Sequence, residues 1–244
     1  MTSVRNIYEF LDQIAPFSTQ VEGDNSGMQT GDFLQTVQNC MVCLDITPDV
    51  IAQAAELQCE LIVSHHPVLF HARKQLLCQD PAWLLARHNI AAIASHTSLD
   101  RAPGGVSDVL ANLLGFTAEP SNELHRLCDL PKAMLASELA AHVKAKLGTP
   151  VQYRDGGQKI MTAAVCGGSG GGSLQYIAGQ AQALVTGEAK HSEFLDAQNQ
   201  GITLIAAGHF ETEVVVVSVL AAKLREEFPA IQWHIAKESG TKHI

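Results

Sequence analysis

Short apolar runs alternate with helical patterns along most of the chain, and this alternation constrains the fold more than any other feature. The runs at 40–45, 60–64 and 90–95 are too short for core helices, so we expect buried strands there. Strands separated by helices favour parallel pairing, and the sequence therefore predicts an α/β fold. The full set of expected elements is strands 40–45, 60–64, 90–95, 150–153, 160–166, 183–186 and 202–206, and helices 4–14, 48–58, 80–88, 106–114, 136–147, 173–181, 189–198 and 211–227.

The alternation occurs twice, on either side of a polar and irregular stretch. That stretch, TAEPSNELHRLCDLP, runs from Thr117 to Pro131. We place a module boundary within it and predict two α/β modules, 1–125 with the N-terminal helix and 126–244, which together form one compact unit. The 244 residues, 46% of them hydrophobic, are enough for a substantial core.

Charge and the N-terminal sequence bear on partners and location. The formal net charge is −9 without a block of like charges, which disfavours binding to nucleic-acid phosphates. Residues 1–5 lack the apolar segment of a signal peptide, and no apolar run approaches the length of a membrane span. We expect a soluble, cytoplasmic protein without nucleic-acid or membrane partners. Cys40 and Cys43 form a C-x-x-C inside a predicted strand, which favours core packing over redox or metal chemistry.

Polar side chains gather at the carboxyl ends of the predicted strands, where open α/β sheets bind their ligands. In SHHPVLF, from Ser64 to Phe70, two histidines follow a buried run and Pro67 ends the strand. Neighbouring strand side chains point to opposite faces, so both histidines can serve one site only where the strand gives way to a loop. The other positions of this kind are Asp45, His96, Asp100, 186–188 and His209.

Two segments place a carboxylate four residues after a histidine. His96 and Asp100 follow one apolar run, and His209 and Glu213 follow another. The second pair can face the same way across a turn into a helix. Each segment also has a plainer interpretation, Asp100 as a loop cap and Glu213 as an acidic residue in a capped first helical turn.

If these strand ends converge, they offer more ligands than one tetrahedral zinc ion needs. Imidazoles with carboxylates suit first-row divalent metals, and a carboxylate can bridge two ions about 3.5–4 Å apart. We therefore expect two divalent ions per subunit, with His65 and His66 on different ions. Zinc, manganese, iron and cobalt all fit such a ligand set.

The motifs DNSGMQTG, VSHHPVLF, SHTSLDRAPGGVSD, VCGGSGGG, LVTGEAKH and GHFETE occur in this order between about residues 20 and 215. In this the chain resembles the NIF-three-like family of dinuclear-metal proteins, commonly named GTP cyclohydrolase 1 type 2 homologues. The resemblance implies two similar α/β modules with a dinuclear metal site in the cleft between them. It assigns His65 and His209 to one ion, His66 and Asp100 to the other, and Glu213 to both.

The same resemblance extends to assembly and to the surroundings of the metals. It places His96 beside the site, facing water or substrate, so that His96 and Glu213 are the implied catalytic residues. It also implies a toroidal homohexamer. The chain departs from the family pattern at Gly23, where a bulky residue is usual, and at Gln182, where an aspartate is common. Neither position is a metal ligand in the pattern.

Two segments bear on the substrate. CGGSGGGS, from Cys166 to Ser173, follows a predicted strand and either cradles an anion with its N–H groups or forms a tight turn into a helix. No Gly-Lys-[Ser/Thr] follows, which excludes a P-loop. Arg73 and Lys74 come shortly after the double histidine and either meet a phosphate or belong to a solvated face.

Two classes of function stay open. The first is a metal-dependent hydrolase of a small nucleotide-like or phosphorylated molecule, as the GTP cyclohydrolase name suggests. The second is a metal-stabilised oligomer that binds or regulates a partner without turnover. An open coordination position beside a pocket would favour the first class, and a ligand set filled entirely by protein would favour the second.

Overall fold

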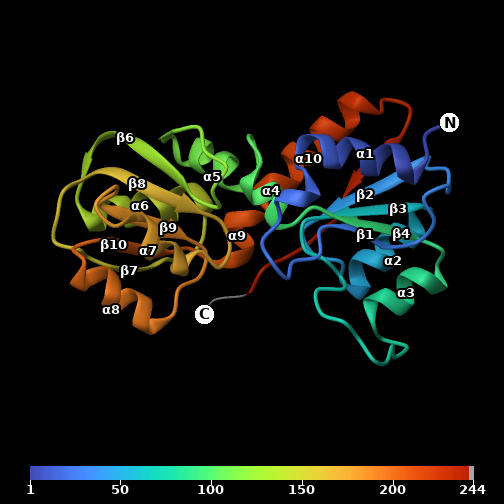
Figure 1. Ribbon diagram of the computed structural model, residues 1–244, viewed down its shortest axis with the longest axis horizontal. Coiled ribbons are helices and arrows are strands. Elements are labelled where there is room, and N and C mark those ends of the chain that lie inside the picture. The colour runs from blue at the N-terminus through green and yellow to red at the C-terminus, as the bar shows by residue number, and fades with distance from the viewer. Residues whose placement is uncertain (242–244) are drawn as a thin grey trace. The chain divides into compact units, whose positions relative to one another are not determined.

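The computed structural model describes residues 1–241, and its contacts divide them into two compact units (Figure 1). The first comprises Met1–Ala102 and Val217–Ser239, and the second comprises Pro103–Val216 with the last described residues, 240 and 241. This division differs from the predicted boundary after residue 125. Residues 103–125, predicted to belong to the first module, lie in the second unit. Residues 217–239, predicted to belong to the second module, lie in the first unit.

In the described part of the chain, the first unit is built around a five-stranded sheet of order β1-β4-β3-β2-β11. The neighbours from β4 to β11 pair in parallel, whereas β1 is an antiparallel edge strand. The strands are β1 (Gly27–Thr30), β2 (Asn39–Cys43), β3 (Leu61–Ser64), β4 (Ala91–Ala94) and β11 (Gln232–Ile235).

Helices cover both faces of this sheet, with α1 and α10 on one side and α2 and α3 on the other (Figure 1). Strand residues such as Met41 and Ile62 pack against Ile51 and Leu85 from the helices. Local signals explain where helices begin: the Thr47 side chain caps α2 and Pro48 is its first residue. The helices are α1 (Val4–Ile14), α2 (Pro48–Glu56), α3 (Pro81–Arg87), α4 (Thr97–Arg101) and α10 (Val215–Glu227).

The second unit contains a six-stranded sheet of order β5-β6-β8-β9-β10-β7, of which β8, β9 and β10 pair in parallel. Alternate residues of these strands face α5 and α6 on one side, and α7 and α8 on the other. The strands are β5 (Thr117–Ala118), β6 (Arg126–Met134), β7 (Gln152–Arg154), β8 (Ile160–Cys166), β9 (Ala183–Thr186) and β10 (Thr203–Ala206). The helices are α5 (Val106–Leu114), α6 (Ala136–Leu147), α7 (Leu174–Ile177), α8 (His191–Asn199) and α9 (His209–Glu213).

Several elements differ from the sequence prediction. Strands β1, β5, β6 and β11 were not predicted, and β6 lies in the stretch interpreted as irregular. That strand begins with Arg126, which is fully buried and whose Nε donates to Asp108 Oδ1 at 2.6 Å. The helix expected at 173–181 is reduced to a 3-10 turn and the four residues of α7, and the one expected at 211–227 is divided into α9 and α10.

Two further observations concern the expectations about cysteines and membranes. Cys40 and Cys43 are buried in β2, and burial raises the pKa of both thiols well above the ordinary value. This agrees with core packing and with low thiol reactivity. Within residues 1–241, no helix combines the length and the apolar character needed to cross a membrane.

Candidate metal centre

Three histidines gather at the carboxyl ends of β3 and β4 in the first unit. His65 and His66 directly follow β3, and His96 follows β4 and caps α4. One ring nitrogen of each lies within 4.8 Å of the others. The backbone of the double histidine is fixed on β2, since the N–H groups of His65 and His66 donate to the carbonyls of Cys43 and Leu44. The two neighbouring positions in the sequence thus lie in one cluster.

The imidazole of His65 is oriented by a backbone carbonyl. Its Nδ1 lies 2.8 Å from the carbonyl oxygen of Ser95, which can only accept a hydrogen bond. Nδ1 therefore carries a proton, and in the neutral ring the lone pair is on Nε2. Nε2 lies 3.6 Å from Oδ1 of Asp100, and the side chain is 1% exposed. The structure thus places Asp100 beside His65, whereas the family pattern pairs it with His66.

His66 is oriented by Asp45, a residue that the sequence placed at a strand end without giving it a role. Nδ1 of His66 lies 2.7 Å from Oδ1 of Asp45. Asp45 follows β2, the neighbour of β3 in the sheet, so parallel pairing brings the two residues together. An ionised carboxylate only accepts, so Nδ1 is again the protonated nitrogen, and in the neutral ring the lone pair is on Nε2.

Asp24 holds His96 in the same way. Its Oδ1 lies 2.7 Å from Nδ1 of His96, and the carboxylate also accepts from the Asn25 N–H and from the N–H and hydroxyl of Thr97. Burial raises the pKa of Asp24, but the hydrogen bonds from His96 and Thr97 outweigh this effect and leave the pKa below its ordinary value. Burial and the neighbouring His65 ring lower the pKa of His96.

In the second unit, His209 and Glu213 occupy the first and last positions of the short helix α9. As their spacing predicts, they face the same way, with Nε2 of His209 2.9 Å from Oε2 of Glu213. On its other side, Nδ1 of His209 lies 3.2 Å from Oε2 of Glu188, which follows β9. Glu213 is buried, at 4% exposure.

The glycine-rich loop after β8 packs directly against this pair. A Cβ on Gly168 would lie 1.9 Å from Oε1 of Glu213, so only glycine leaves room for the carboxylate. The N–H groups of Gly168, Gly170 and Gly171 donate to Thr212, Thr186 and Glu188, respectively. Because these N–H groups are engaged within the protein, the structure favours the tight turn and not the anion cradle.

His65, His66, His96 and His209 share one feature. Nδ1 of each ring lies at hydrogen-bonding distance from a carbonyl or carboxylate oxygen of the protein, and this contact turns Nε2 to the opposite side of the ring. Metal-binding histidines are oriented in this manner, most often by a carboxylate or a backbone carbonyl. Each unit also has a carboxylate beside a histidine, Asp100 in the first and Glu213 in the second, and imidazole with carboxylate is a combination of donors that fits a first-row divalent ion.

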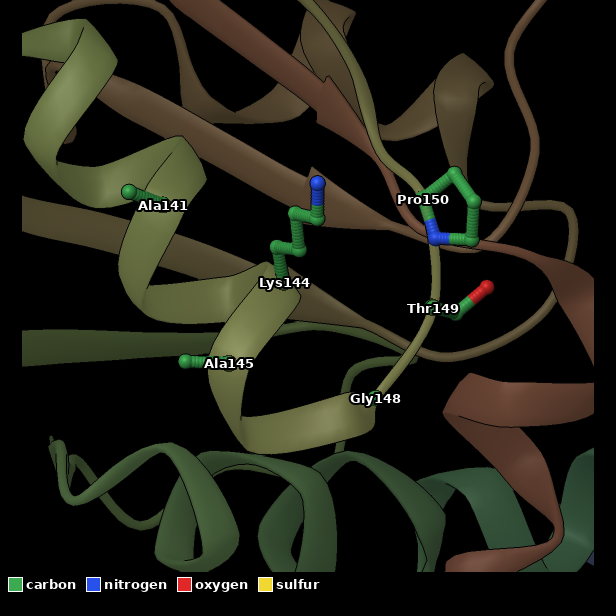
Figure 2. Close-up of a pocket in the computed structure, with 6 residues that line it drawn as sticks. All are labelled: Ala141, Lys144, Ala145, Gly148, Thr149 and Pro150. Atoms are coloured by element: carbon green, nitrogen blue, oxygen red, sulfur yellow. The ribbon is translucent and has the colours of Figure 1, made fainter.

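Other parts of the structure contribute less to such a site. Arg73 forms an ion pair with Asp80, so its guanidinium is engaged away from the histidines, and Lys74 is exposed. A cavity of about 410 Å³ in the second unit is lined by residues 141, 144, 145 and 148–150 (Figure 2). Lys144 extends over it from α6, and its lining contains neither imidazole nor carboxylate, which makes it unsuitable for a metal.

Comparison with known proteins gives a consistent family match. The model of the Duf34/NIF3 (NGG1p interacting factor 3) family matches residues 2–241. A GTP cyclohydrolase 1 type 2 homolog of Clostridium acetobutylicum is 30% identical over 91% of this chain and 89% of its own length. One of Campylobacter jejuni is 32% identical over 90% of each chain. The crystal structure of Staphylococcus aureus protein SA1388 superposes with a TM-score of 0.90 at 26% identity, covering 100% of this chain and 99% of that one.

Proposed function

Since the chain belongs to the Duf34/NIF3 family, we propose that it is a dinuclear metal protein and a hydrolase of a small nucleotide-like or phosphorylated molecule. The ligands of the two units would bind the same pair of divalent ions. His65 and Asp100 would hold one ion, His66 and His209 the other, and Glu213 both. This pairing follows the position of Asp100 beside His65.

One observation carries the metal proposal: in each unit the Nε2 atom of a histidine faces a carboxylate. Nε2 of His65 points at Asp100 from 3.6 Å although Nδ1 already holds the ring proton against the Ser95 carbonyl. Nε2 of His209 lies 2.9 Å from Glu213, with Glu188 on Nδ1. Imidazole nitrogens and carboxylate oxygens that are oriented toward each other are the two donor types that a first-row divalent ion takes, and such an ion would be held between them in each unit.

The ions and the residues around them would have different roles in hydrolysis. When bound, two divalent ions lower the pKa of a water and polarise the bond under attack. His96 is held by Asp24 and presents Nε2 as an acceptor for a proton from water or substrate. We assign His96 this role because its Nδ1 partner is a buried carboxylate, the arrangement that orients a general base.

The substrate class rests on the relatives' name and on one side chain. Those relatives are named GTP cyclohydrolase 1 type 2 homologs. Phe70 is 45% exposed, and its ring centroid is 6.0 Å from that of His96. Its backbone neighbour Leu69 is anchored by the side chains of Asn25 and Gln29. An anchored, exposed aromatic ring beside the histidines suits a substrate with a planar ring.

A metal-stabilised oligomer that binds a partner is the second candidate. The exposed apolar side chains of Leu76, Leu77 and Trp83 favour it, because they lie on one segment and offer a surface to another copy or another protein. In that case the ions would support assembly, and no turnover would be found. A homohexamer is compatible with both candidates.

A substrate screen of the metal-reconstituted protein distinguishes the candidates. The library should contain nucleotides, their phosphate-free nucleosides and simple phosphate esters, and each active compound should be repeated with Glu213→Ala. For a hydrolase we expect turnover by the wild type and none by the variant. Activity that survives in Glu213→Ala, or a fully loaded protein with no substrate and metal-dependent assembly, contradicts the hydrolase proposal.

A further inference from the structure

A pair of carboxylates, Asp45 and Glu238, stands behind His66 at the end of β2. Asp45 accepts the Nδ1 proton of His66 at 2.7 Å. The Asp45 side chain is 46% exposed, so packing alone does not hold it in this position. What restrains it is its backbone, which belongs to the peptide segment just beyond the strand.

Glu238 grips that peptide segment with both carboxylate oxygens. Oε2 accepts the N–H of Leu44 and Oε1 the N–H of Asp45, each at 2.8 Å. The carbonyl of Leu44 in turn accepts the N–H of His66 at 2.9 Å. Two hydrogen bonds of His66, one from its backbone N–H and one from its ring, therefore end on residues held by Glu238.

The segment carrying Glu238 is itself anchored on the sheet. Strand β11 pairs in parallel with β2 through Ile235, which lies opposite Val42. Gln53 then holds Lys237 through a reciprocal pair of hydrogen bonds to its N–H and carbonyl, at 2.9 and 3.1 Å. Glu238 thus extends from a fixed backbone and can restrain the peptides that it contacts.

We infer that Asp45 and Glu238 are positioning residues for His66, and that the segment after β11 is thereby part of the metal centre. The inference rests on the proposed dinuclear function. Removing the hydrogen-bonding partner of a metal-binding histidine lowers metal affinity by about 10- to 100-fold. The loss should fall on the ion held by His66 and leave the ion beside His65 in place.

Metal titration of the apo-protein tests the inference, with Zn²⁺ as the probe and a chromophoric chelator as competitor. We expect two binding steps in the wild type. In Asp45→Ala one step should weaken by about 10- to 100-fold, and in Glu238→Ala the same step should weaken by a smaller factor. Asp45→Asn keeps an acceptor oxygen and should recover part of the affinity. Asp49→Ala and Glu227→Ala remove exposed charges of the same unit and should behave as the wild type.

Nitrogen-15 NMR of the metal-free protein gives a second readout, which needs no metal. We expect His66 of the wild type to be a single tautomer protonated at Nδ1, and to become a mixture in Asp45→Ala. Two unchanged binding steps in Asp45→Ala and Glu238→Ala, or an unchanged tautomer in Asp45→Ala, overturn the inference. A wild type that binds no Zn²⁺ while His66 keeps the Nδ1–H tautomer refutes the dinuclear proposal instead.

Discussion

Gly168→Ala should release metal without direct contact between the new methyl group and an ion. The backbone of Gly168 has φ +59°, and the added Cβ would lie 1.9 Å from Oε1 of Glu213 and 3.2 Å from Nε2 of His209. Contacts below 3.0 Å do not persist, so the carboxylate or the loop must move by about 1 Å. Metal–ligand distances tolerate only about 0.2 Å. We therefore expect both ions to bind at least about 10- to 100-fold more weakly, as with lesser disturbances of ligand geometry.

The same substitution has a separate effect on stability that can be measured alongside. A left-handed backbone costs alanine about 1–2 kcal/mol, which corresponds to a loss of about 2–8 °C in Tm for a chain of this size. Gly172→Ala is the matched control in the same loop, because its Cβ would meet no atom within 4 Å and its φ is not positive. Elemental analysis and calorimetry of both variants would check the prediction. Two ions at wild-type affinity in Gly168→Ala would refute the role given to the loop.

Three further predictions concern the ligands, the buried aspartate and the assembly. Glu213→Ala should lose both ions while Asp100→Ala loses about one, as elemental analysis would show; two ions retained in Glu213→Ala would contradict the bridging assignment. Asp24→Asn should lower the free energy of unfolding by about 1.5–3 kcal/mol at pH 7. The folded-state pKa of Asp24 lies below its ordinary value of 3.8. The stability difference between wild type and Asp24→Asn should therefore persist above pH 3.8 and disappear as the pH falls through the folded-state pKa. Urea titrations that give an equal difference at about pH 7 and at about pH 2 would contradict this prediction. Light scattering should show a hexamer at micromolar concentration, and a monomer would exclude the ring.

The sequence predicted the parallel strands β2, β3, β4, β8, β9 and β10 because their apolar runs are short, aliphatic and bounded by turn residues. It failed at β6, where Arg126 is buried beside Asp108, 18 residues earlier in the chain, and donates to backbone carbonyls as well. It also failed at β1 and β11, whose strand pairing is decided by partners far along the chain. The spacing of apolar residues shows which face of a segment is buried. Whether a segment of mixed polarity forms an edge strand depends instead on the strand that it pairs with in the folded protein.

The candidate ligands could be found from sequence because the histidines follow apolar runs, where a polar residue stands out, and each carboxylate comes four residues after a histidine. Their supporting partners could not. Asp24 lies in a polar loop about 70 residues before His96, and Glu238 lies 193 residues after Asp45. No local pattern marks a carboxylate whose role is to hold another side chain. The pairing of Asp100 with His65 likewise required coordinates, since both histidines of the double motif precede it by similar distances.

The return of the chain to the first unit has a consequence for synthesis on the ribosome. Pro103–Val216 is one continuous stretch, so it can complete its sheet as soon as it has emerged. The first unit lacks β11 until residues 232–235 are translated, and until then the apolar strand β2 presents an open edge. Such an edge recruits other strands and promotes aggregation. The unit whose synthesis begins first is therefore completed only after the sheet of the second unit has been synthesised.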